Sequence, residues 1–185
     1  MNIFYLHEEP KTCAEQHLDK HVVKMLIEYA QLMSTAHRML DGQEYVAKSK
    51  TGRKVTRYRL DNPNEEATVY KACHLNHPSA VWVRASAYNY HWLYRMWSHL
   101  HEEFQIRYGK DHKSYVVLKE LLRNPPKNIP LNIPFNQPTQ AMPDDVKNED
   151  SITAYRDYYI KYKNSFATWK TSVPEWYSEG INANI

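Results

Sequence analysis

The sequence is poor in glycine and cysteine and has no long apolar run. Four glycines in 185 residues argue against a sandwich or barrel with many tight turns. Two cysteines, Cys13 and Cys73, are too few for a disulfide scaffold, so we expect a reducing compartment. No stretch reaches the ~18 apolar residues of a membrane span, and the first ten residues lack the features of a signal peptide. These absences predict a soluble intracellular protein with no membrane partner.

The signatures of several enzyme classes are also missing. There is no glycine-rich phosphate loop, no dinucleotide fingerprint, no Ser-His-Asp order, and no HExxH or CxxC zinc motif. Cationic residues number 24 and acidic residues 21, which gives a formal charge of +3 with ten neutral histidines. This mild basicity suits a phosphate-bearing ligand and is lower than an obligate duplex-DNA binder usually shows.

What the sequence does contain is a long amphipathic segment, Thr12 to Leu40. Its apolar residues recur every three or four positions, which predicts one long helix. The opposite face carries a thiol, imidazoles, amines, a carboxylate and a hydroxyl, which together can bind a polar ligand. We expect this polar face to border an enclosed hollow. Its residues are Cys13, His17, Lys20, His21, Lys24, Glu28, Gln31, Thr35 and Arg38.

The remaining pattern predicts a mainly α fold in a single domain, residues 1–185. A second long helix is predicted over 79–108, with further helices over 65–74, 114–123 and 150–170. The whole is a helical bundle of about four to five helices. Residues 44–60 predict an appended β-hairpin. Residues 124–144 hold six of the ten prolines and predict a long wrapping loop.

The predicted hairpin is strongly basic. Six cations lie in twelve residues, and strand alternation places Arg57 and Arg59 on one face with Thr56 and Tyr58 on the other. Such a ribbon suits a phosphate chain or a nucleotide, although a solvated surface ribbon is an equally ordinary interpretation.

A second group of candidates lies at the start of the second long helix. Free N–H groups near His77 and Ser79 are typical of anion sites, Trp82 is a stacking candidate, and Asn89 lies inside the apolar arc. Ordinary capping and a hydrogen-bonded core amide remain open as alternatives. The predicted ligand-binding residues are Lys20, Lys24, Arg38, Arg57, Arg59, His77, Ser79, Trp82, Arg84 and Asn89.

Catalysis is the main alternative to simple binding. His17 and His21 are candidates for acid and base, since imidazole titrates near neutrality, and Glu28 for orienting one of them. Cys13, His17 and His21 recur every four residues, but this spacing matches no known zinc signature. We predict neither a metal nor a cofactor.

Three stretches carry a likeness to known proteins: CAEQHLDKHVVKMLIEYAQLMSTAHRML, HPSAVWVRASAYNYHWL and AMPDDVKNEDSITAYRDYYIKYKNSFATWK. They resemble a family of small tailed-phage proteins, cyanophages included, over nearly the whole length. The resemblance implies a phage product working in the host cytoplasm and carries over no catalytic residues.

Three functions follow as hypotheses. The first is a pocket that binds a nucleotide or cyclic nucleotide, sequestering a host immune signal. The second is a hydrolytic enzyme, a phosphodiesterase or base-excising activity, acting on a nucleotide or nucleic acid. The third is an inhibitor that binds a host protein. A homodimer is compatible with each of them.

Overall fold

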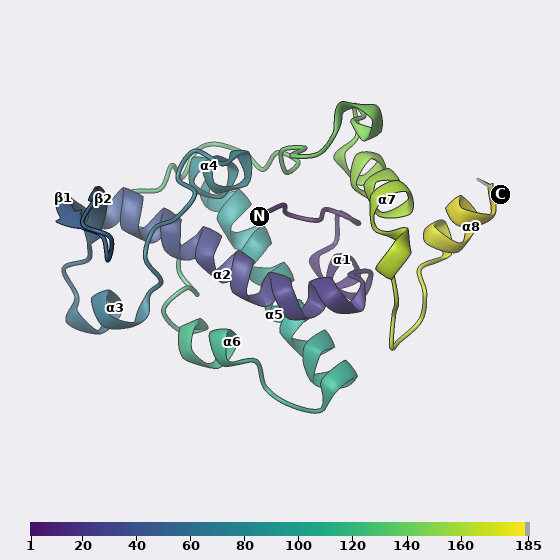
Figure 1. The fold of residues 1–185 in the computed structure, drawn as a ribbon, viewed down its shortest axis with the longest axis horizontal. Coiled ribbons are helices and arrows are strands. Elements are labelled where there is room, and N and C mark those ends of the chain that lie inside the picture. Colours follow the sequence, from purple (N-terminus) through teal and green to yellow (C-terminus); the bar gives the residue numbers. More distant parts are fainter. Residues whose placement is uncertain (184–185) are drawn as a thin grey trace.

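The computed structural model describes residues 1–183, and these residues are mainly helical with one small antiparallel hairpin (Figure 1). This confirms the predicted mainly α fold class. In chain order, the α-helices and strands are α1 (Pro10–Glu15), α2 (Asp19–Asp41), β1 (Gln43–Lys48), β2 (Lys54–Arg59), α3 (Pro63–Thr68), α4 (Pro78–Ala85), α5 (Ala87–Tyr108), α6 (Lys113–Leu118), α7 (Ser151–Tyr162) and α8 (Glu175–Ala183). Short 3-10 turns lie at Asp144–Val146 and Asn164–Phe166.

The first long helix is broken in two, which corrects the prediction of one helix over Thr12 to Leu40. The chain is extended at Leu18, with ψ at 156°, between α1 and α2. Backbone carbonyls near this break accept hydrogen bonds from a distant side chain: Arg107 donates to Glu15 at 2.8 Å and to His17 at 2.7 Å. The break is therefore stabilised by a tertiary contact that the local pattern does not contain.

The second predicted helix is broken in the same way. Ser86 is extended (φ −155°, ψ 140°) and separates α4 from α5. Its hydroxyl accepts the N–H of Tyr88, which caps α5, and donates to the carbonyl of Ile133 at 2.5 Å. Here too, a hydrogen bond to a residue far away in the sequence stabilises the break between the two helices.

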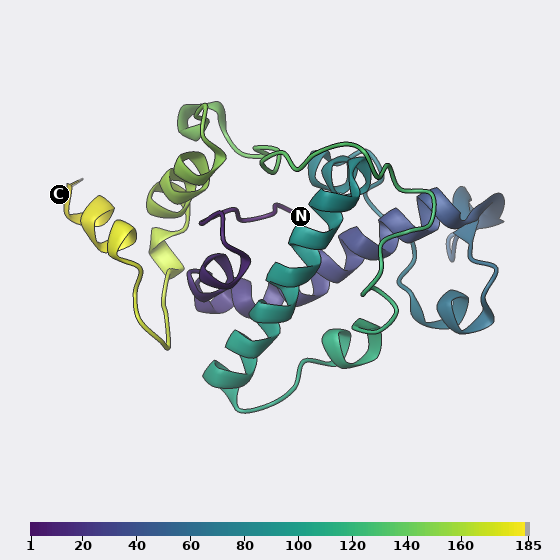
Figure 2. The same cartoon turned by 180° about the vertical axis from the view of Figure 1, so that it is seen from behind.

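The proline-rich loop, residues 124–143, has no helix or strand, as predicted. Figure 2 shows it running from α6 across the side of α4 and α5 towards α7. The other predicted helices are present but shorter than expected, and α8, which follows Pro174, is a helix that was not predicted. Within residues 1–183, no helix is both long enough and apolar enough to cross a membrane.

The hairpin is confirmed, and a buried arginine anchors it. Arg38, near the end of α2, is only 3% exposed. Its guanidinium donates to the carbonyls of Tyr58, Val69 and Tyr70 at 2.6 to 2.8 Å. It also binds the Glu66 carboxylate at 2.6 Å and the Glu66 carbonyl at 3.0 Å. The prediction that Arg38 binds a ligand is therefore wrong, because each guanidinium nitrogen already has a protein partner.

Replacing Arg38 by methionine should destabilise the fold by about 3–5 kcal/mol, because the buried carbonyls and the Glu66 carboxylate lose their donor. Arg123→Met is the matched control, since the Arg123 side chain is 69% exposed and pairs only with exposed Glu120. Urea unfolding of the two variants measures the difference. Equal free energies of unfolding would show that Arg38 does not anchor the hairpin.

Candidate functional site

The site begins with the N-terminal segment, which is buried in the middle of the molecule. Residues 3–6 are between 0 and 5% exposed. The ring of Phe4 contacts His21 on α2 and Tyr155, Tyr158 and Tyr159 on α7. The segment therefore lies as an extended arm between two helices and brings the amino group of Met1 beside Glu28 of α2.

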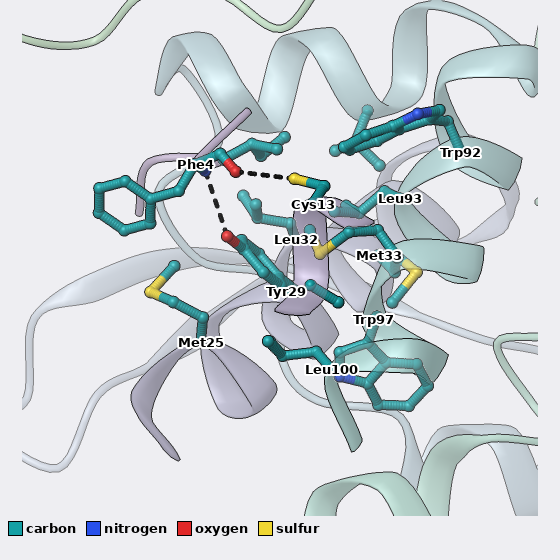
Figure 3. Close-up of a cluster of buried hydrophobic side chains, with 14 of the residues drawn as sticks. Phe4, Cys13, Met25, Tyr29, Leu32, Met33, Trp92, Leu93, Trp97 and Leu100 are labelled. Atoms are coloured by element: carbon teal, nitrogen blue, oxygen red, sulfur yellow. Dashed lines mark hydrogen bonds between the residues drawn. The ribbon is translucent and has the colours of Figure 1, made fainter. Parts of the chain in front are cut away.

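A buried imidazole–phenol network holds this arm in place, and Figure 3 shows its last contact, between the Tyr29 hydroxyl and the backbone N–H of Phe4. His17 Nδ1 lies 2.7 Å from the carbonyl of Cys13, so Nδ1 carries the proton and donates it. His17 Nε2 is then an acceptor for the Tyr29 hydroxyl at 2.8 Å. The Tyr29 oxygen in turn accepts the backbone N–H of Phe4 at 3.2 Å. Each member of the network thus has a partner of the right kind.

The same geometry corrects the catalytic prediction for His17. The residue is completely buried, and both ring nitrogens are hydrogen-bonded. Burial lowers its pKa from 6.5 to about 4, and the nearby Arg107 charge adds to this, while the Cys13 hydrogen bond opposes it. His17 is therefore a neutral structural residue at physiological pH and not an acid or a base.

The depressed pKa of His17 makes stability depend on pH. The unfolded chain binds a proton near pH 6.5 that the folded chain binds only near pH 4. This stabilisation is present above about pH 6.5 and is lost as the pH falls towards 4. When the pH is lowered from 7 to 5, the effect of His17 alone should reduce the free energy of unfolding by about 2 kcal/mol.

Comparing His17→Gln with His91→Gln tests this dependence, because His91 is exposed on α5. The expected result is a smaller loss of stability on acidification for His17→Gln than for the wild type, with His91→Gln unchanged. Urea unfolding at the two pH values provides the data. Parallel pH profiles for all three proteins would contradict the buried neutral imidazole.

A small polar cavity opens where the arm meets α2. Its volume is about 230 Å³. It is lined by Met1, Asn2, Phe4, His21, Lys24, Met25, Glu28, Ala141, Tyr158 and Lys163. Three residues predicted from the polar face of α2, namely His21, Lys24 and Glu28, therefore share this hollow.

Positive charge is in excess around the cavity. Glu28 is the sole carboxylate in its lining, and it lies 3.1 Å from Lys24 Nζ and 3.4 Å from the amino nitrogen of Met1. Lys163 Nζ lies 4.5 Å from the centre of the Tyr158 ring. Within residues 1–183 Lys163 has no ion pair, so its charge is available to an anion.

His21 contributes a neutral imidazole to this cavity. Its Nδ1 is hydrogen-bonded to the Tyr159 hydroxyl at 2.7 Å, and its ring stacks on Phe4 at 4.0 Å. Burial lowers its pKa to about 2, with further lowering by the charges of His17, Lys163 and Lys24. Nε2 has no hydrogen-bond partner in the described part of the chain. It is therefore free to bind a group that enters the cavity.

The second group of predicted residues does not reach this cavity, because they fix the proline-rich loop and the loop before α4. Asn89 is fully buried and exchanges hydrogen bonds with Asn136, and Trp82 donates to the Asn136 carbonyl at 2.9 Å. His77 accepts the N–H of Ser79 and caps α4. Asn89 is therefore a hydrogen-bonded core amide, and Trp82 is buried within the protein and does not present its ring to a ligand.

The other predicted residues lie apart from the cavity. Arg84 donates to the carbonyl of Leu75 at 2.8 Å. Lys20 is exposed, with Nζ 4.7 Å from the centre of the Phe166 ring. Arg57 and Arg59 lie on the hairpin at the far end of α2. The structure therefore divides the predicted ligand-binding set between several places.

Seven of the ten lining residues escape prediction from the sequence, and two polar ones among them come from far along the chain. Lys163 and Tyr158 belong to α7 and its end, about 140 positions after His21 along the chain. Only the packing of α7 beside the N-terminal arm brings them to α2. The amphipathic pattern of α7 indicates that one of its faces is buried, but it does not indicate which element packs against that face.

No cluster of three or more potential metal ligands occurs among residues 1–183. The Cys13 thiol instead donates to the carbonyl of Phe4 at 3.2 Å, so the row Cys13, His17, His21 does not converge. A larger hollow of about 620 Å³ lies between α7 and α8, and none of the predicted residues lines it.

Comparison of the chain with family models, with curated proteins and with solved structures found no match. The function of the cavity is therefore inferred from the chemistry of its own residues.

Proposed function

We propose that the N-terminal cavity binds a phosphate group of a nucleotide ligand. The observation that supports this most directly is the local charge: the cavity is lined by three ammonium groups, those of Lys24, Lys163 and Met1, and by one carboxylate, Glu28. Phosphate binds well where ammonium groups and a neutral hydrogen-bonding imidazole converge. Lys163 and the free Nε2 of His21 are the groups that an incoming phosphate would contact first.

The volume of the cavity limits which part of the ligand can enter it. At about 230 Å³ it is smaller than the ~300–1,000 Å³ typical of pockets for whole ligands. The phosphate end therefore enters, and the ribose and base remain at the mouth. Half-buried Tyr158 offers a ring on which a base can stack there.

The resemblance to tailed-phage proteins supplies the setting of this proposal. In the cytoplasm of an infected host, a nucleotide or cyclic nucleotide that signals infection is a ligand of the right chemistry. Sequestration requires a pocket but no catalytic motif, in agreement with the missing enzyme signatures.

Replacing Lys163 by glutamine should weaken nucleotide binding about tenfold, because one charge-assisted contact to phosphate is lost. Lys113→Gln is the matched control, since Lys113 is exposed at the start of α6, away from the cavity. Isothermal titration with linear and cyclic adenine and guanine nucleotides measures both variants. Equal affinities for the wild type and Lys163→Gln, or no binding by the wild type, would refute the proposal.

Hydrolysis of the bound nucleotide is the second candidate, supported by the presence of His21 and Glu28 in one cavity. Glu28 is the group suited to accept a proton from water, because the lowered pKa of His21 makes its imidazole a very weak base. Mass spectrometry of ligand recovered after incubation and denaturation distinguishes the candidates. An altered ligand with wild type and an intact one with Glu28→Gln supports catalysis, whereas an intact ligand in both supports binding alone.

A further inference from the structure

The net positive charge of the protein is concentrated in the hairpin. Residues 43–61 contain six cationic and two acidic side chains. The whole chain has 24 and 21, so the remaining residues hold 18 cationic and 19 acidic side chains and are nearly neutral. The modest total of +3 therefore hides a strongly basic segment on an otherwise balanced molecule.

The hairpin projects from the body beyond the end of α2, as both ribbon views show (Figures 1 and 2). Its tip is the five-residue loop 49–53, which connects Lys48 and Lys54, the last paired residues of the two strands. Lys48, Lys50, Arg53 and Lys54 are all exposed. Within residues 1–183, none of the hairpin cations forms an ion pair. Their charges are therefore not neutralised by the protein itself.

The register places further cations along one face. Tyr45 pairs with Arg57, and Gln43 pairs with Arg59, so these four side chains share a face. The Arg59 guanidinium lies over the Tyr45 ring at 4.8 Å. The cations are thus divided between the two faces of the ribbon, with Arg57 and Arg59 on one face and Lys48 and Lys54 on the other.

The base of the hairpin is rigidly attached. Arg38 binds the Tyr58 carbonyl from inside α2. At the junction, a Cβ on Gly42 would lie 2.3 Å from the Arg38 carbonyl oxygen. The backbone at Gly42 therefore packs directly against the last turn of α2, with no room for a side chain. The base of the hairpin is therefore tied to α2 before any ligand arrives, which lowers the entropic cost of binding.

We propose that this hairpin inserts into the major groove of double-stranded DNA, with its cations on the phosphates of both groove walls. The major groove of B-DNA, about 12 Å wide, admits a two-stranded ribbon. The deep, narrow major groove of A-form RNA does not. The contact is mainly to phosphate and is independent of the nucleotide cavity.

Fluorescence anisotropy with a labelled DNA duplex of about 20 base pairs, over a salt series from about 50 mM, tests the proposal. The test variant carries K48Q, K50Q, R53Q and K54Q. The matched control carries K11Q, K113Q, K119Q and K127Q, which remove the same charge from exposed sites outside the hairpin. The hairpin variant should bind at least about tenfold more weakly, with a salt slope lower by up to about 3.6, because four phosphate contacts are lost.

Three results would overturn the proposal: no duplex binding by the wild type at low salt, equal weakening in both variants, or tighter binding of duplex RNA than of DNA. Circular dichroism checks that both variants are folded. If the quadruple variant unfolds, K50Q and K54Q alone carry the same expectation at about one unit of slope each. The hairpin variant should keep its nucleotide affinity, so failure here is separable from failure of the cavity proposal.

Discussion

The hydrogen-bonded row from Cys13 through His17 and Tyr29 to Phe4 is the interaction on which the rest of this structure depends. It ties the N-terminal arm to α2 without any exposed group. The arm then forms one wall of the cavity and carries Met1 to Glu28. A protonated His17 would have no acceptor nitrogen for the Tyr29 hydroxyl, so the arrangement requires a neutral ring. Burial lowers the pKa of His17 and so keeps the ring neutral.

Much of the fold is predictable from local sequence patterns. The predictions that fail are those that depend on contacts between residues far apart in the sequence. The hairpin, the proline-rich loop and the apolar faces of the long helices follow from spacing and proline content. The breaks at Leu18 and Ser86 do not, because donors and acceptors far along the chain stabilise them, such as Arg107 and the Ile133 carbonyl. Helical periodicity continues through both breaks and gives no sign of them.

The site illustrates the same limit. The polar face of α2 has an unusual composition, but most of it meets protein partners instead of a ligand. His17 binds Tyr29, and Arg38 anchors the hairpin. Only His21, Lys24 and Glu28 reach the cavity, where α7 adds Tyr158 and Lys163. A histidine on an amphipathic helix does not reveal whether a tyrosine 138 residues later will be its partner.

We propose that the ligand site lies at the N-terminal arm and not beside the start of α4 and α5. Backbone amide NMR with a titrated nucleoside monophosphate tests it most directly. The account predicts the largest shift changes at residues 2–4, 21–28 and 158–163, with residues 79–89 nearly unaffected. Shift changes concentrated at 79–89, with residues 21–28 unmoved, would contradict it.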